Sequence, residues 1–259
     1  MGLYDYFERI YVVNLPARSD RRQEMVRELG KIGWPVRGGK LEFFDACRFE
    51  ERGEFPTLGA RGCFMSHLSI LREARSLGLK NVLVLEDDLM FTGALLAGEQ
   101  KLVEELERVE WGMVHLGYRI PERDTTSETL ELAERMKGGS EKGVELREVR
   151  PVEEVLTTAF YGVNGMVFDR AIGCLEGILS RPGGHVEGGP MHVDGAFNTF
   201  RRQNEDVRAY VSVPSLSEER PSRSDVTPGK LDQVGLLRPV ARLARWVKRL
   251  RSDGRLSVA

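Results

Sequence analysis

The stretch NVLVLEDD, residues 81–88, decides the fold, because it joins the strongest apolar run of the chain to three consecutive acids. Residues 81–85 form a short, mostly apolar run that is rich in branched side chains, and this pattern predicts a strand buried on both faces. Glu86, Asp87 and Asp88 follow at its carboxyl end. Ligands of open α/β sheets bind outside the carboxyl ends of the strands, so we place the candidate site there.

Segments on either side of this strand alternate between apolar runs and helical periodicity. We predict strands at residues 10–15, 41–46 and 112–117, and helices at residues 19–30, 59–78 and 92–108. Farther along we predict strand, turn and strand over residues 157–168, helices at 169–180 and 192–203, and a strand at 207–213. Such alternation favours an α/β fold with a mostly parallel mixed sheet flanked by helices.

The length of 259 residues fits one large domain or two small ones. We interpret residues 1–235 as one domain. Within it, residues 119–155 are rich in Glu, Arg, Thr and Gly and show little periodicity, which predicts a mobile insertion. With 41% hydrophobic and 30% charged residues, the composition excludes a fully disordered or collagen-like chain.

Residues 236–259 form a basic C-terminal segment, with seven basic residues and one acid between positions 238 and 255. Val240, Leu243 and Val247 recur on one side of a predicted amphipathic helix at 239–251. Such a helix can lie on an anionic membrane. The alternative is that its apolar stripe packs on the domain. The balance of 38 basic and 40 acidic residues gives no support for nucleic-acid binding.

Cysteine usage and the N-terminal sequence bear on the compartment. The three cysteines are an odd number without a CxxC pair, which is typical of free thiols in a reducing compartment. The N-terminal sequence lacks the basic and apolar regions of a signal peptide. We therefore expect a cytoplasmic bacterial protein that contacts the inner face of the membrane through residues 239–251.

The acidic triplet favours metal binding. Side chains alternate along an extended chain, so Glu86 and Asp88 are predicted on one side and Asp87 on the other. Two carboxylates can hold a hard cation such as Mn²⁺ or Mg²⁺, which usually also takes oxygens from a substrate diphosphate. The alternative is an acidic loop that only faces water.

Three blocks resemble glycosyltransferase family 25 in order and spacing: IYVVNLPARSDRR (10–22), GARGCFMSHLSILREA (59–74) and NVLVLEDD (81–88). That family includes bacterial lipopolysaccharide galactosyl- and glucosyltransferases and animal collagen galactosyltransferases. Three later blocks resemble it more weakly: AFYGVNGMVFDRA (159–171), HVDGAF (192–197) and SRSD (222–225).

The resemblance implies a GT-A-like, Rossmann-like single domain, an inverting sugar transfer and a UDP-sugar donor. Glu86 and Asp88 then occupy the place of the DxD motif that holds Mn²⁺ and the donor diphosphate. Arginines after the first strand suit phosphate, although they can instead pair with nearby acids. The residues expected to bind the donor are Asn14, Leu15, Arg18, Arg21, Ser66, His67, Glu86 and Asp87.

Inverting transfer requires a general base for the acceptor hydroxyl. Asp194 is the first candidate, because it matches the later Asp block of the family, and Glu187 is an alternative. His192 is a candidate third metal ligand beside Glu86 and Asp88. The sequence spacing leaves these roles open.

We expect transfer of galactose or glucose to a hydroxyl of a cell-surface glycan, such as lipopolysaccharide, capsule or a lipid-linked oligosaccharide. Two alternatives remain. One is a non-catalytic relative that binds a nucleotide sugar, and the other is a metal-dependent nucleotide-diphosphate hydrolase or nucleotidyltransferase.

Overall fold

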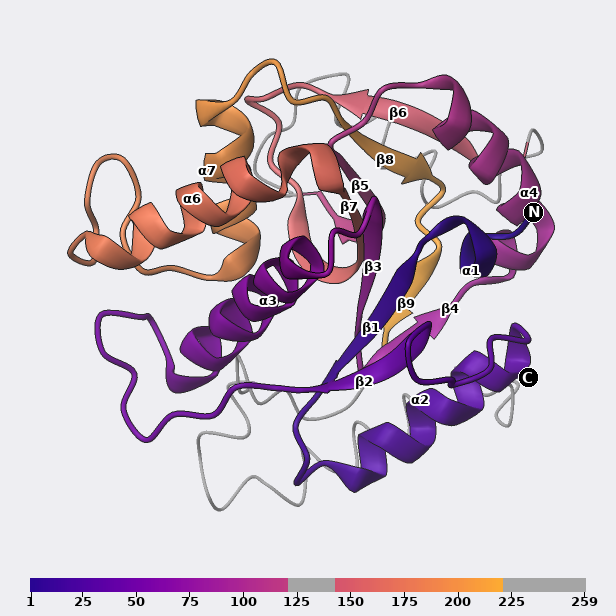
Figure 1. Cartoon of the computed structure of the whole chain (residues 1–259), viewed down its shortest axis with the longest axis horizontal. Helices are drawn as coiled ribbons and strands as arrows, with labels where there is room; N and C mark the ends of the chain where they lie inside the picture. The colour runs from indigo at the N-terminus through magenta and orange to yellow at the C-terminus, as the bar shows by residue number, and fades with distance from the viewer. Residues whose placement is uncertain (121–142, 221–259) are drawn as a thin grey trace, which may run out of the picture.

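The computed structural model describes residues 1–120 and 143–220. Its centre is a seven-stranded sheet in the order β2-β1-β3-β7-β5-β8-β6 (Figure 1). The strands are β1 (Arg9–Asn14), β2 (Leu41–Asp45), β3 (Asn81–Glu86), β5 (Met113–Arg119), β6 (Glu145–Val149), β7 (Leu156–Asn164) and β8 (Ala209–Val213).

The sheet is mixed. β1 pairs in parallel with both β2 and β3, and β5 pairs in parallel with β8. β7 is antiparallel to its neighbours β3 and β5, and the edge strand β6 is antiparallel to β8. Five strands therefore run in one direction and two in the other. The predicted α/β fold, with a mostly parallel mixed sheet flanked by helices, is confirmed.

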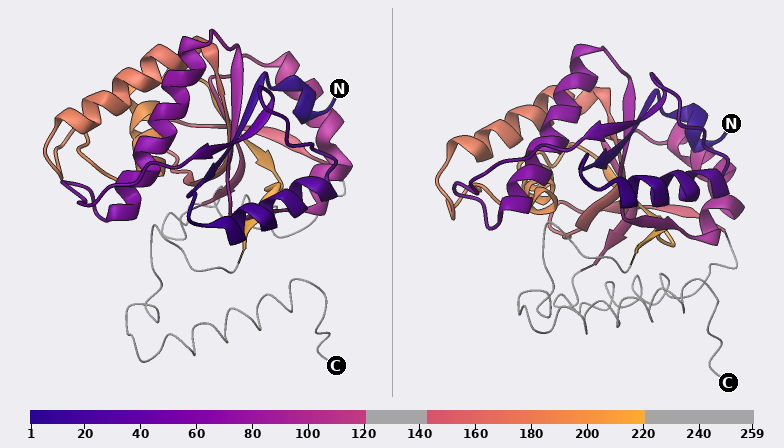
Figure 2. Two further views of the ribbon diagram at one scale, coloured as in Figure 1. Left: turned by 60° about the horizontal axis from the view of Figure 1, so that its bottom comes forward. Right: turned by 90° about the horizontal axis from the view of Figure 1, so that it is seen from below.

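Helices cover both faces of the sheet (Figures 1 and 2). Apolar side chains alternate along β1 and β3, so that Tyr11 and Val84 face one helix layer while Val12 and Leu85 face the other. The first layer holds α3 (Leu58–Ser76), α6 (Phe168–Ser180) and α7 (Val193–Gln203), and the second holds α1 (Leu3–Tyr6), α2 (Ser19–Lys31) and α4 (Gly93–Arg108).

Residues 157–168 differ from the prediction of strand, turn and strand. They form most of the single strand β7, followed by the 3-10 turn η1 (Gly165–Val167). Gly162 lies inside this strand. A Cβ there would lie 2.7 Å from the ring of Phe7, so this glycine permits close packing and does not turn the chain.

The prediction also missed three short strands. β6 lies within the predicted insertion, and its polar sequence suits an edge strand that is open on one side. β4 (Leu89–Phe91) and β9 (Ser217–Glu219) form a separate two-stranded sheet. The predicted helix at 239–251 and the SRSD block lie outside the described residues. Among the described helices, none has the length and apolar character needed to cross a bilayer.

The reversed direction of β7 matters for the site. Phe160 pairs with Leu85, so the first residues of β7 lie at the edge of the sheet where β1 and β3 end. The N-terminal half of α3 lies over the same edge, because α3 leads back to the start of β3 (Figure 2).

Candidate functional site

Asp87 is a structural member of the acidic triplet. Its Oδ1 accepts a hydrogen bond from a terminal guanidinium nitrogen of Arg21 at 2.9 Å, and its Oδ2 accepts one from Asn14 Nδ2 at 2.6 Å. Asn14, Arg21 and Asp87 are all buried. Burial raises the pKa of Asp87, while Arg21 and Asn14 oppose that shift. The three residues join the ends of β1 and β3 to the first turn of α2.

Asp88 does not continue the predicted alternation. Its Oδ2 lies 3.1 Å from the same Arg21 nitrogen that contacts Asp87. The reason is that β3 ends at Glu86 and the chain turns at the next two residues. Burial raises the pKa of Asp88, and the charge of Glu219 adds to this, whereas Arg21 and Arg220 oppose it.

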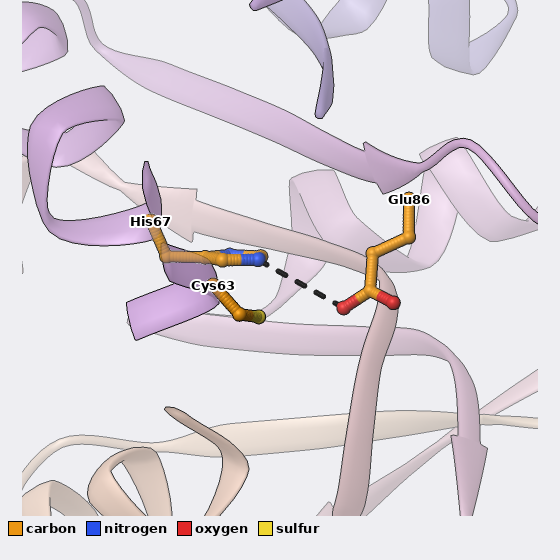
Figure 3. A group of neighbouring side chains, drawn as sticks. All are labelled: Cys63, His67 and Glu86. Carbon is orange, nitrogen blue, oxygen red and sulfur yellow. Dashed lines mark ion pairs between the residues drawn. The ribbon is translucent and has the colours of Figure 1, made fainter. Parts of the chain in front are cut away.

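Glu86 faces the other way, toward α3. Its Oε1 accepts a hydrogen bond from the Thr158 hydroxyl at 2.8 Å and lies 3.8 Å from His67 Nε2 (Figure 3). Burial raises the pKa of Glu86, and the negative charge of Asp88 raises it further. Because Glu86, Asp88 and Glu219 repel one another, and because carboxylate oxygens suit hard cations, the residues present fit Mn²⁺ or Mg²⁺.

His67 is fully buried on α3. Its Nδ1 lies 2.7 Å from the Tyr161 hydroxyl, and the two rings stack with centroids 5.6 Å apart. Burial lowers the pKa of His67 to about 3, so the imidazole is neutral near pH 7. Burial also raises the pKa of Tyr161 well above its usual value, so its hydroxyl keeps its proton.

Ser66 links α3 to the preceding loop. Its Oγ donates to the Gly62 carbonyl at 2.7 Å and accepts from the Cys47 N–H at 2.8 Å. A Cβ on Gly62 would lie 2.6 Å from the Cys47 carbonyl, so only glycine lets this loop approach the helix. These contacts give Ser66 a positioning role.

Arg18 and Leu15 follow β1 directly. Arg18 donates to Asp20 through Nε and a terminal nitrogen, both at 3.0 Å, and this pairing lowers the pKa of Asp20. Leu15 is partly exposed between β1 and α2. Both arginines expected to bind phosphate, Arg18 and Arg21, thus contact acids. Donor binding by Asn14, Leu15, Arg18 and Arg21 stays a prediction.

Asp194 lies in the first turn of α7. Its Oδ2 accepts from the Thr157 N–H at 3.1 Å, and its Oδ1 accepts from the Gly195 N–H at 2.8 Å. It also lines a cavity of about 350 Å³. The other polar residues around this cavity are Glu154, His185, Glu187, Asn198, Thr199, Arg202 and Gln203.

Glu187 lines this cavity, and His192 directly precedes α7. Glu187 is exposed at the cavity, with Oε2 3.2 Å from a terminal nitrogen of Arg181. His192 is the residue before α7 and is partly exposed. Among the described residues, the grouped potential ligands are Cys63, His67 and Glu86, and His192 does not join them. Its metal role stays a prediction.

Thr158, Tyr161 and Glu219 were missed as site residues. Thr158 and Tyr161 lie on β7, in or beside the AFYGVNGMVFDRA block. Their chemistry depends on pairing with Glu86 and His67, which are more than 70 residues away in the sequence. Only the strand pairing of β3 with β7 reveals these contacts.

Comparison with known proteins bears on the family. Residues 7–130 match the model described as glycosyltransferase family 25 (LPS biosynthesis protein). Residues 7–130 thus belong to glycosyltransferase family 25. The resemblance found in the three sequence blocks is confirmed. These family 25 residues include β1, α2, α3 and β3, and with them the acidic triplet.

Curated proteins similar to this chain differ in described activity. It is 30% identical over 189 residues to the human "Inactive glycosyltransferase 25 family member 3", covering 60% of this chain and 32% of the relative. It is 32% identical over 132 residues to "Procollagen galactosyltransferase 1" of Danio rerio, covering 43% of this chain and 21% of the relative. The matches thus span a third or less of these relatives.

Among solved structures, A197 from STIV aligns over 81% of this chain and 83% of its own. The TM-score is 0.41 and the identity is 12%. The fold assignment of this chain therefore depends on its own sheet topology.

Proposed function

We propose that the chain is a metal-dependent, inverting glycosyltransferase that moves a hexose from a UDP-sugar to a glycan hydroxyl. Galactose and glucose are the proposed hexoses, and lipopolysaccharide, capsule or a lipid-linked oligosaccharide are the proposed acceptors. The observation that carries the proposal is the position of Glu86 and Asp88 at the carboxyl edge of β3, within residues that belong to family 25.

Asp88 and Glu86 are proposed to hold the cation, which would be Mn²⁺ or Mg²⁺. When bound, the cation would neutralise charge on the departing UDP. Asp87 holds Arg21 in place through a hydrogen-bonded ion pair. Asn14 and Arg21 thereby keep the end of β3 in a fixed position, so the donor would meet a preorganised edge.

Asp194 is proposed as the general base. The acceptor oxygen would attack the anomeric carbon of the donor, the bond from that carbon to the UDP oxygen would break, and the hydroxyl proton would pass to Asp194. Two backbone N–H groups hold this carboxylate at the cavity, at Thr157 and Gly195. Attack from the side opposite the leaving group gives inversion.

The cavity beside Asp194 is the proposed acceptor site. Its volume of about 350 Å³ and its amide, hydroxyl and charged side chains suit a polyhydroxylated group. Glu187 at its edge is the alternative base. A non-catalytic nucleotide-sugar-binding protein is the second candidate function, because the human relative is described as inactive.

Calorimetry with UDP, with and without Mn²⁺, tests the proposal. We expect metal-dependent binding in the wild type and its loss in Asp88→Asn. Asp206→Asn is the matched control, because Asp206 pairs with Arg170 on a distant surface. Product analysis with donor sugars then separates the alternatives: UDP plus a glycoside indicates transfer, UMP indicates diphosphate hydrolysis, and binding without turnover indicates the non-catalytic relative.

A further inference from the structure

Cys63, His67 and Glu86 bring a sulfur, a nitrogen and an oxygen together at the end of β3 (Figure 3). Cys63 and His67 lie four residues apart in α3, so their side chains share one face of the helix. Glu86 reaches them from the end of β3. All three potential ligand atoms lie within 4.8 Å of one another.

The spacing between His67 and Glu86 is too long for a hydrogen bond and suits a shared metal ion. Nε2 of His67 and Oε1 of Glu86 are 3.8 Å apart. A nitrogen and an oxygen bound at ~2.0–2.2 Å around a tetrahedral zinc ion are separated by roughly 3.3–3.5 Å. The observed separation of 3.8 Å is slightly longer, so a small side-chain shift would bring both atoms onto one ion.

The His67 ring leaves one nitrogen without a partner. Nε2 is buried and makes no hydrogen bond with the described residues. It points at the Glu86 carboxylate (Figure 3). A buried polar atom without a partner is unfavourable, and a metal ion at this position would satisfy it.

Two residues of β7 hydrogen-bond to the candidate ligands. The Tyr161 hydroxyl lies 2.7 Å from His67 Nδ1, and its oxygen can accept a hydrogen bond from Nδ1–H. In that tautomer the Nε2 lone pair is free for a metal. The Thr158 hydroxyl donates to Glu86 and also lies beside the Cys63 thiol. Hydrogen bonds of this kind orient the ligands of metal sites.

We infer that Cys63, His67 and Glu86 form a second binding site, for a borderline-soft divalent cation of the zinc class, which shares Glu86 with the cation proposed at Asp88 and Glu86. Thiolate and imidazole ligands favour Zn²⁺ over Mn²⁺ or Mg²⁺. Three protein ligands leave a fourth position for water or a substrate oxygen. Cys63 and Glu86 are partly exposed, whereas His67 is fully buried. The ion ties α3 to the end of β3 and shares Glu86 with the triplet.

Titration of the chelator-stripped full chain with Co²⁺, followed by Zn²⁺, tests the site. A cobalt–thiolate bond gives a charge-transfer band in the near ultraviolet, which we expect in the wild type and expect Zn²⁺ to abolish. Cys63→Ser should remove the band and weaken Zn²⁺ binding by at least about tenfold. Cys174→Ser is the matched control, because Cys174 is also partly exposed and lies outside the cluster.

Asp88→Asn should keep the cobalt band, because Asp88 is not a member of the cluster. This variant separates the inferred site from the cation of the proposed transferase, so one can fail without the other. Circular dichroism verifies that each variant is folded. A wild type without the band, or a folded Cys63→Ser that binds Zn²⁺ like the wild type, would overturn the inference.

Discussion

Glu86 and Asp194 are held by two consecutive residues of one strand. The Thr158 hydroxyl donates to Glu86 Oε1 at 2.8 Å, and the Thr157 N–H donates to Asp194 Oδ2 at 3.1 Å. The proposed metal-binding carboxylate and the proposed base are thus positioned by the first residues of β7. Any shift of that backbone would move both groups together.

Thr157 adopts an unusual backbone conformation, with φ of 69°. A β-branched residue with this φ costs about 1–3 kcal/mol, whereas glycine adopts it freely but loses about 0.5–1 kcal/mol of chain entropy. We expect Thr157→Gly to keep or raise the free energy of unfolding, by up to about 1 kcal/mol. Denaturant unfolding measures this. Thr157→Val, which keeps the branch, is the control, and a clear loss in Thr157→Gly alone would contradict the expectation.

Asp194→Asn should lower kcat by about 10²–10⁴-fold with little change in the donor KM, because an amide cannot take the acceptor proton. The amide oxygen can still accept a hydrogen bond from the Thr157 N–H, so the fold should persist. Steady-state kinetics measures both constants. Glu187→Gln is the companion variant, and the base would be reassigned to Glu187 if that change caused the loss while Asp194→Asn did not.

Arg21→Met should destabilise the fold by about 3–5 kcal/mol, because it leaves the buried Asp87 carboxylate without its cation. Adding Asp87→Asn should recover part of this loss, since the remaining charge is removed. Arg22→Met is the control on the same helix, where the exposed guanidinium lies over the Phe43 ring. Equal losses of unfolding free energy in the two arginine variants would show that the buried pair has no special role.

His115 should make the protein sensitive to acid. Burial, assisted by the charge of Arg201, lowers its pKa to about 3 in the folded state, while the unfolded chain titrates near the ordinary value of 6.5. Below pH 6.5 the unfolded chain therefore takes up a proton that the folded protein excludes. Stability from this group is complete above pH 6.5 and is lost as the pH falls toward 3, by up to about 1.4 kcal/mol per pH unit.

His115→Phe tests this, because a phenyl ring can keep the stacking on Tyr161. Denaturant unfolding at several pH values should show a shallower loss of stability below pH 6.5 in the variant. His67 remains in both proteins, so its contribution cancels in the comparison. Parallel pH profiles would mean that His115 does not distinguish the folded from the unfolded chain.

Local patterns predicted the elements that carry strong apolar periodicity. β3 follows from the apolar residues before Glu86, and α3 follows from its helical spacing. β6 could not be predicted in this way, because an edge strand with polar residues lacks an apolar signature. The strand, turn and strand predicted over residues 157–168 failed for a related reason: Gly162 packs against Phe7, which comes from far away in the sequence.

In the site, too, local sequence predicted some features, and contacts between distant residues determined the others. The sequence located the acidic triplet correctly at the end of a strand. It could not show that Arg21 spans 66 residues to bind Asp87, or that Thr157 spans 37 residues to bind Asp194. The turn after Glu86, which directs Asp88 toward Arg21, also depends on tertiary structure.

The opposed settings of Glu86 and Asp87 have an evolutionary consequence. Asp87 stabilises the junction of β1, β3 and α2, while Glu86 sits in a repulsive cluster of acids that a neutral side chain would relieve. Selection for stability alone would therefore retain Asp87 and erode Glu86. A lineage that no longer needs the activity can therefore lose Glu86, keep the fold and gain stability.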